Sequence, residues 1–462
     1  MSKKVKNKET RVGVGKLLIW NSRMIATTFA TLMYGFLMIY CTDTLKIEPI
    51  LVSGMLLASK VADGVTDLFA GFIVDKTQTK WGKARPYEVF VVLLCMCKWL
   101  MFSCPAEWST TVKCVWVFIM YTLANAVCYT FLNANSTPYL VRAFKGEQIV
   151  KVTSYGSIIP MLAGFVFNIV FPITMAQIAS SPAGWSRLVA FWMVPAALIG
   201  ILRMLFVEEK YEVESEEKKK EKIRFRHVIE LFRTDKYILL IVLMQFVFNF
   251  VTTFGANTYY YTYIVKNVGL MGIVSAITFI AIPLAFIFPK LINRFSTAKL
   301  MMAGLIISAT GYLLNFFAGA NIPLLMIGQL LTGAGSVPAS MLIALCIVDC
   351  AEYNEYKGVH RMEGTMSSVV GLGQKVGSAI GGSILGVVLT FAGYTGAAET
   401  LTDSVLLVIR LMYSLVPMVL FVATALCLTG YLKLDKKLPE IRKENEARRA
   451  AQVVKADSAE QE

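Results

Sequence analysis

Long apolar runs alternate with short polar connectors along the whole chain. A membrane-spanning helix needs about 20 largely apolar residues, and twelve runs in the sequence approach or exceed that length. The pattern therefore predicts an all-α membrane protein with twelve transmembrane helices. We place them at residues 24–42, 49–74, 87–105, 111–137, 152–178, 185–207, 237–265, 268–289, 298–318, 322–349, 364–393 and 405–432.

Basic residues are distributed unevenly over the regions outside these runs. Counted from the N-terminus, every other region holds at least two Lys or Arg residues, whereas each region between holds at most one. Positive residues collect on the cytoplasmic side of a membrane protein. We therefore predict a multi-pass protein of the cell (inner) membrane whose two termini and central connector face the cytoplasm.

A charged connector divides the predicted helices into two sets of six. Two such sets around one loop are typical of transporters with a binding site near the bilayer midplane. The sequence thus predicts two pseudo-symmetric bundles and two cytoplasmic segments, the second of them solvated. These are an N-terminal bundle at 1–207, a central loop at 208–236, a C-terminal bundle at 237–434 and a charged tail at 435–462.

The composition excludes a soluble protein. Hydrophobic residues make up 56% of the chain, charged residues only 16%, and the mean hydropathy is +0.60. The net charge of +14 does not indicate nucleic-acid binding, because Lys and Arg lie in connectors and acidic residues interleave with the longest basic runs. We expect a lipid bilayer around the protein, no nucleic-acid partner and a functional monomer.

Enzyme chemistry has no support in the sequence. No phosphate-binding loop is present, both histidines lie in predicted loops, and the nine cysteines form no C-x-x-C pair. Gly373, Gly377 and Gly381 recur every fourth residue inside an apolar run, a spacing that lets two helices pack closely. We therefore expect a protein that is not an enzyme and has neither a metal site nor an organic cofactor.

The second predicted helix carries three charged residues. Lys60, Asp63 and Asp67 are spaced i, i+3 and i+7, which places them on one face of the helix. Because a charge at bilayer depth costs at least about 2.5–3.5 kcal/mol, we predict a functional site there. The two carboxylates could bind Na⁺ together with Thr66, or one of them could hold a proton. A structural ion pair between Lys60 and Asp63 is the alternative.

A further intramembrane charge lies in the other half of the chain. Lys375 stands deep in the run at 364–393, beside Gln374 and Ser378. We predict that it pairs with Asp63 or Asp67 and that the pair couples cation binding to movement of the two halves.

Uncharged polar residues form stripes at helical spacing in three further runs. Amide and hydroxyl groups on facing helices suit a hydroxyl-rich ligand such as a sugar, although each could equally serve as an interhelical hydrogen bond. The predicted substrate-binding residues are Thr27, Tyr34, Asn125, Tyr129, Thr130, Asn133, Gln245, Asn249, Thr253 and Asn257.

Two longer motifs resemble a known family. The first runs from Asp63-Gly-Val-Thr-Asp67 through Asp75 to Trp81-Gly-Lys83-Ala-Arg85-Pro86, and the second runs from Asp349 through Glu352 to Arg361-Met-Glu363-Gly364. Both resemble signatures of the glycoside–pentoside–hexuronide:cation symporters, a branch of the major facilitator superfamily. Lys375 falls where that family has a lysine. Ala379-Ile-Gly381 and Val416-Pro417 are more similar to the glucuronide carriers than to the melibiose carriers.

The resemblance implies a secondary active transporter that imports a glycoside, pentoside or hexuronide with Na⁺ or H⁺ by alternating access. It implies cation binding by Asp63 and Asp67, and a position for Lys375 between cation and sugar. Thr27 stands where melibiose carriers have a sugar-binding aspartate. Cytoplasmic gate contacts are expected from Asp75, Lys83, Arg85, Glu352, Arg361 and Glu363. A non-sugar cargo such as a lysolipid or an amphipathic anion, or a receptor without transport, is the alternative.

Overall fold

The structure is a computed structural model, and it is helical throughout the residues that it describes. Ten helices in those residues are long and apolar enough to cross a membrane. No strand occurs among them, apart from one isolated bridge between Thr79 and Gly82. The described residues are 12–145, 147–156, 158–211, 236–281, 291, 294–358, 363–396 and 401–459.

The ten helices coincide with ten of the twelve predicted spans. In place of the span predicted at 87–105, the structure has a shorter helix, α5 (Phe90–Met101). This helix follows a 3-10 turn at Arg85–Val89. The span predicted at 268–289 begins with α15 (Gly269–Ala276) in the structure. Residues 282–290 of that span lie outside the described residues. The all-α membrane fold is confirmed, whereas the count of twelve and the location of the termini stay predictions.

The chain forms two compact units. Unit 1 contains residues 1–218, 255–276 and 382–408, and unit 2 contains residues 219–254, 277–381 and 409–462. The boundaries predicted for the two bundles stay predictions. Complete helices of unit 1 are α2 (Val14–Leu32), α3 (Leu37–Ile39), α4 (Pro49–Lys76), α5, α6 (Thr110–Thr122), α7 (Thr130–Ala143), α8 (Glu147–Gly156), α9 (Ile158–Ile178), α10 (Pro182–Gly200), α11 (Leu202–Phe206), α14 (Ala256–Tyr259) and α15.

Unit 2 holds the helices of the C-terminal half of the chain. Two helices, α20 (Glu363–Phe391) and α21 (Asp403–Tyr413), run from one unit into the other. Those entirely within unit 2 are α13 (Lys236–Thr253), α17 (Thr297–Ala318), α18 (Ile322–Met341), α19 (Ile343–Tyr356), α22 (Leu415–Leu428) and α23 (Leu432–Ala459).

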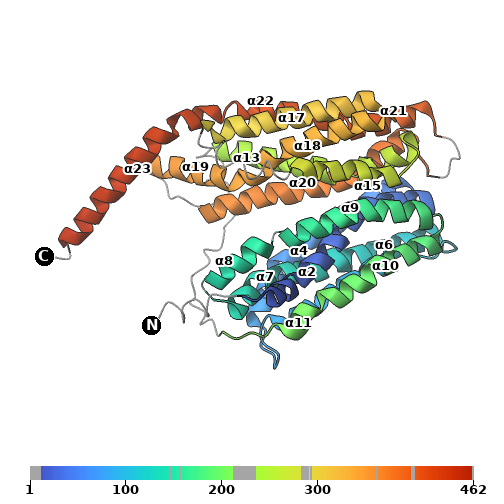
Figure 1. The fold of residues 1–462 in the computed structure, drawn as a ribbon, viewed down its shortest axis with the longest axis horizontal. Helices are drawn as coiled ribbons and strands as arrows, with labels where there is room; N and C mark the ends of the chain where they lie inside the picture. Colours follow the sequence, from blue (N-terminus) through green and yellow to red (C-terminus); the bar gives the residue numbers. More distant parts are fainter. Residues whose placement is uncertain are drawn as a thin grey trace. The chain divides into compact units, whose positions relative to one another are not determined.

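Aromatic and small side chains pack the helices of unit 1. Helix α2 lies against both α9 and α10 (Figure 1). Phe167 of α9 packs against Trp192 of α10 with ring centroids 5.0 Å apart, and Phe29 of α2 contacts both rings. Edge-on and tilted aromatic pairs of this kind stabilise a core beyond their buried area.

Glycines bring the helices of unit 2 into close contact. Helices α17, α18 and α22 run side by side in Figure 1, and a Cβ atom on Gly311 of α17 would lie 2.5 Å from the Gly328 carbonyl oxygen of α18. On α20, a Cβ atom added to Gly377 would lie only 2.3 Å from the carbonyl oxygen of Phe246 in α13. Gly381 meets Phe250 in the same way. The packing predicted from the four-residue glycine spacing is confirmed.

A buried ionic cluster joins four helical segments of unit 1. The Glu88 carboxylate, which is 0% exposed, lies 3.2 Å from the Arg23 guanidinium and 3.5 Å from the Arg203 guanidinium. Asn135 donates a 3.0 Å hydrogen bond to the same carboxylate, and the Arg203 guanidinium stacks on the Trp20 ring. Two buried cations thus depend on one carboxylate, because a buried charge is tolerated only when it is paired.

The C-terminal helix α23 packs against other helices of unit 2. Its Leu434, Leu438, Ile441 and Asn445 are buried at helical spacing. Arg442 binds the Asp349 carboxylate of α19 at 2.7 Å, and the Asn445 amide donates to the Glu352 carboxylate at 3.0 Å. One face of the predicted tail is therefore buried over residues 435–445, where we expected solvent on all sides, because Leu438 and Ile441 form an apolar stripe within that charged segment.

We expect Arg442→Ala to destabilise unit 2 by about 1–3 kcal/mol, because it leaves the buried Asp349 carboxylate without its cation. Thermal unfolding in detergent would measure the loss. Glu444→Ala is the matched control: it removes the 2.6 Å pair with Arg448, in which both side chains are about half exposed, and such pairs contribute at most about 0.5 kcal/mol. Equal melting temperatures for the two variants would contradict the anchoring of α23.

Candidate functional site

Two carboxylates and one hydroxyl meet in unit 1. Helix α4 presents Asp63 and Asp67 on one face, as predicted. The Thr130 hydroxyl, at the start of α7, lies 3.1 Å from an oxygen of each carboxylate. A single hydroxyl thus lies between two acidic groups from another helix, and three oxygen atoms face one small volume.

An irregular segment sets the position of Thr130. The helix that leads into α7 is π-helical over Leu123–Tyr129, and Thr130 follows at once. The Thr130 hydroxyl also lies 3.3 Å from the Asn125 carbonyl oxygen inside that segment. Such π-helical turns are frequent at functional sites, because they rotate one helical face relative to the next.

Lys60 and Thr66 flank the carboxylates on α4. The Lys60 ammonium lies 3.9 Å from Asp63, so the structural ion pair that was the alternative is present. That contact is long and both side chains are about a quarter exposed, so the ion pair itself contributes little to stability. The Thr66 hydroxyl donates to the Ala62 and Asp63 carbonyl oxygens of its own helix, at 3.2 and 3.0 Å. We predicted that Thr130 binds substrate, whereas the residue that we predicted to join the two carboxylates was Thr66. In the structure, the Thr130 hydroxyl contacts both carboxylates.

The remaining polar residues predicted in unit 1 lie on several helical segments. Thr27 of α2 donates to carbonyl oxygens of its own helix. The rings of Tyr34 and Tyr121 pack edge to face with centroids 4.9 Å apart, and the buried Asn125 amide donates to the Tyr121 carbonyl oxygen. Predicted residues Tyr129, Asn133 and Asn257 are half-buried, exposed and half-buried, respectively.

The stripe predicted on α13 belongs largely to unit 2. Asn249 donates to the carbonyl and side-chain oxygens of Gln245, at 2.9 and 3.1 Å. Thr253 donates to the Asn249 carbonyl oxygen at 2.7 Å and lies 3.3 Å from the Ser378 carbonyl oxygen of α20. Most of these hydrogen bonds lie within α13, and only the one from Thr253 to Ser378 joins two helices. Substrate binding by these residues stays a prediction.

The structure describes the predicted coupling lysine but only some of the predicted gate residues. Lys375 is exposed on α20, and its pairing with Asp63 or Asp67 stays a prediction. Arg361 and the side chains of Asp75 and Glu363 lie outside the described residues. Glu352 contacts Asn445, as stated above.

Lys83 and Arg85 bind within unit 1. The Glu209 carboxylate accepts hydrogen bonds from the backbone amides of Lys83, Ala84 and Arg85, at 3.2, 2.7 and 2.7 Å. The Arg85 guanidinium donates to the carbonyl oxygens of Met204 and Leu205, at 2.6 and 2.9 Å. The loop that contains the first family motif is therefore fixed to the end of α11.

The sequence analysis missed a second carboxylate cluster in unit 1. Asp43 accepts hydrogen bonds from the hydroxyls of Tyr263 and Tyr394, and Thr42 contacts it at 2.7 Å. The Thr42 hydroxyl also lies 2.8 Å from that of Tyr259. Burial raises the pKa of the Tyr394 phenol, so this group stays a hydrogen-bond donor. The only sequence signal was an acid directly after the predicted end of the first helix.

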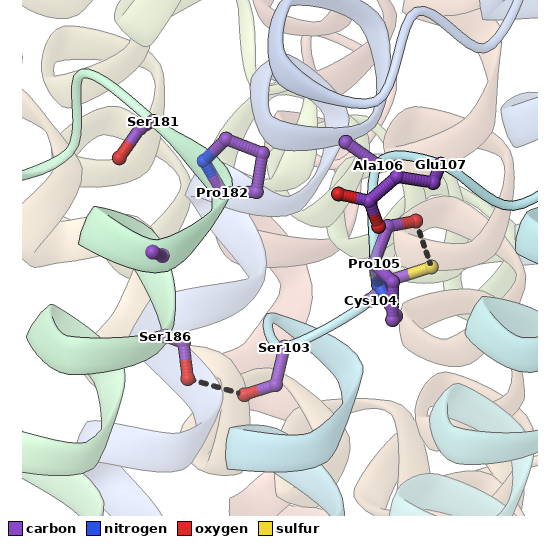
Figure 2. Close-up of a pocket in the computed structure, with 9 residues that line it drawn as sticks. Ser103, Cys104, Pro105, Ala106, Glu107, Ser181, Pro182 and Ser186 are labelled. Carbon is purple, nitrogen blue, oxygen red and sulfur yellow. Dashed lines mark hydrogen bonds between the residues drawn. The ribbon is translucent and has the colours of Figure 1, made fainter.

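A small pocket of about 390 Å³ lies apart from all of these residues. Figure 2 shows it between the loop after α5 and the start of α10, where the hydroxyls of Ser103 and Ser186 lie 2.7 Å apart. None of the predicted site residues lines it. The pocket is therefore not the candidate site, which we assign to Asp63, Asp67 and Thr130.

Comparison with known proteins identifies the family. A family model described as "MFS/sugar transport protein" matches residues 13–436. The chain belongs to this family. It is consequently a multi-pass membrane transporter and not an enzyme, and the resemblance to the glycoside–pentoside–hexuronide:cation symporters is confirmed.

Curated relatives cover almost the whole chain. An uncharacterized symporter YnaJ of Bacillus subtilis is 29% identical over 89% of this chain and 90% of its own length. An isoprimeverose transporter of Lactiplantibacillus pentosus is 25% identical over 92% and 90%, respectively. A glucuronide carrier protein homolog of Escherichia coli is 26% identical over 93% and 94%.

Solved structures of transporters share the fold. A mutant form of the nucleoside transporter NupG superposes with a TM-score of 0.62 at 14% identity, over 89% of this chain and 99% of its own. A D-xylose–proton symporter superposes with a TM-score of 0.57 at 13% identity, over 87% and 96%. At this identity the likeness shows the fold alone.

Proposed function

We propose that this protein imports a sugar together with Na⁺ or H⁺ by alternating access. The sugar is a glycoside, pentoside or hexuronide, the classes to which the family resemblance points. The observation that carries the cation coupling is the Thr130 hydroxyl 3.1 Å from both Asp63 and Asp67. No cofactor is required beyond the coupling ion.

The proposed cation site uses the chemistry of its three oxygen atoms. The Thr130 hydroxyl donates to a carboxylate, and Lys60 offsets part of the negative charge. When Na⁺ enters, the same hydroxyl can turn its lone pairs toward the ion, while one carboxylate oxygen from each aspartate completes the site. A proton would instead neutralise one of the two adjacent carboxylates.

Neutralising the carboxylates supplies the coupling. Two carboxylates in a membrane protein repel each other and resist burial, whereas the cation-loaded pair is easier to enclose. We propose that the loaded pair permits the change of access that carries sugar inward. We propose that Lys375 takes the place of the cation at the aspartates during the part of the cycle in which no cation is bound.

Uptake by right-side-out membrane vesicles tests this function. The vesicles receive a mixed panel of glycosides, pentosides and uronides under an imposed Na⁺ gradient and, separately, under a proton gradient. Mass spectrometry then records which compounds accumulate, with vesicles lacking the protein as the control. We expect one class to accumulate under one gradient. Folded protein that accumulates none of them under either gradient would contradict sugar import and favour a different cargo.

A further inference from the structure

Lys98 is a buried basic residue within the apolar run at 87–105. It lies on α5 and is 0% exposed. Its ammonium nitrogen has no hydrogen-bond partner, carboxylate or other, among the described residues. The group nevertheless lies over the ring of Tyr34, which belongs to the predicted substrate site. An aromatic ring attracts a cation but accepts no ordinary hydrogen bond from it.

An ammonium without an acceptor is costly inside a membrane protein. A buried charge normally has an oppositely charged partner, since its separation from water is otherwise uncompensated. Lys113 of α6, in the same unit, has at least a polar acceptor: it is 8% exposed, and its ammonium donates to the Leu45 carbonyl oxygen at 3.1 Å. Within the part of the chain that the structure describes, Lys98 has no such acceptor, and a ligand that carries negative charge would supply one.

Tyr34 connects Lys98 to the candidate site. The Tyr34 ring contacts the Lys98 ammonium, and it packs against the ring of Tyr121 on α6, the helix that leads through the π-helical segment to Thr130. Lys60 of α4 lies close enough to Lys98 for their positive charges to repel each other. The neighbouring titratable groups on α5 itself are the thiols of Cys95 and Cys97.

The charges of this part of unit 1 do not balance once a cation is bound. Lys60 and one monovalent cation together offset Asp63 and Asp67, so neither carboxylate remains to pair with a protonated Lys98. A neutral sugar would leave that charge uncompensated, whereas a sugar carboxylate would neutralise it. The arrangement therefore favours an anionic substrate in the cation-loaded state.

We propose that Lys98 is a specificity-determining residue that makes this transporter select sugars bearing a carboxylate. Rotation of the Tyr34 side chain would open the ammonium to the sugar carboxylate, which then accepts a charge-assisted hydrogen bond. This inference rests on the proposed sugar import and narrows it to hexuronides. It also assigns the selectivity to a residue outside both family motifs.

A matched pair of compounds tests the proposal. Phenyl β-D-glucuronide and phenyl β-D-glucoside differ only at C6, where a carboxylate replaces a hydroxymethyl group. Uptake of each is measured in proteoliposomes that contain the purified full-length protein, under the same cation gradient. We expect the wild-type protein to take up the glucuronide at least about tenfold more efficiently than the glucoside, because only the glucuronide can form a buried charge pair with Lys98.

Variants assign the preference to the ammonium. We expect Lys98→Met to remove the preference by raising KM for the glucuronide while KM for the glucoside changes little. Lys98→Arg, which keeps the charge and the donors, should retain most of it. Lys113→Met is the control. It also removes a buried lysine, but the Lys113 ammonium already donates to the Leu45 carbonyl oxygen and needs no acceptor from the sugar. Its preference should equal that of the wild type.

The outcomes separate this inference from the proposed function. Uptake of the glucoside without a glucuronide preference in the wild type overturns the selectivity and leaves sugar import standing, and this comparison needs no variant to fold. A preference that survives in folded Lys98→Met also overturns it. Uptake of neither compound, from a protein that also failed the wider sugar panel, overturns both proposals.

Discussion

Asp67→Asn is expected to abolish concentrative uptake while sugar still equilibrates across the membrane. The substitution keeps the shape of the side chain but removes one of the two charges next to Thr130. A cation that binds one carboxylate instead of two is held too weakly to couple its gradient to the sugar. A tenfold ion gradient is worth about 1.4 kcal/mol, which supports about tenfold accumulation with one cation per sugar. We expect that ratio to fall to about one.

The accumulation ratio in vesicles and the rate of sugar exchange without a gradient are the two measurements for this variant. Asp67→Glu serves as the control because it retains the carboxylate, and we expect it to keep some accumulation. Thr130→Ala should weaken cation dependence without abolishing it, since both carboxylates remain. Full accumulation by folded Asp67→Asn would remove Asp67 from the coupling site.

Glu88→Ala is expected to cause the largest loss of stability among single substitutions in unit 1. It deletes the carboxylate that lies 3.2 Å from Arg23 and 3.5 Å from Arg203, both of which are almost fully buried. Removing one partner from a buried ionic cluster costs about 3–5 kcal/mol, because the remaining charges have no compensation. The Arg203 contact with the Trp20 ring offsets only a small part of this cost.

Thermal unfolding of purified protein in detergent, together with the yield of folded protein from membranes, measures the effect. Glu107→Ala is the control, since Glu107 is exposed and a substitution there should change the free energy of unfolding by no more than about 0.5 kcal/mol. An unchanged melting temperature for Glu88→Ala would show that the cluster contributes nothing to stability.

Local spacing predicted those features that depend on one helix. The positions of Asp63 and Asp67 follow from helical periodicity, and the structure places both within reach of one hydroxyl. The glycine spacing on α20 likewise predicted close packing, because every fourth residue of a helix faces the same neighbour. Hydropathy identified ten of the spans, because the length and apolar character of a membrane helix are properties of one continuous segment.

Features that depend on residues distant in the sequence could not be predicted in this way. Asp43 binds tyrosines that are 220 and 351 positions away, and no local pattern indicates such partners. Thr130 reaches the aspartates from another helix after a π-helical turn, which periodicity does not foresee. Lys98 and Glu88 each lie in an apolar run, where averaging over a window conceals a single charge.

The movement of the cation under a sugar gradient is the most direct test of cation-coupled sugar import. Proteoliposomes with no ion gradient receive, on the outside, the sugar identified by the vesicle panel. Internal ²²Na⁺ and internal pH are then followed, with Asp67→Asn as the uncoupled control. Because coupling is reciprocal, we predict that sugar entry drives Na⁺ or protons inward against the resulting gradient. Equilibration of the sugar while neither cation moves would contradict the account.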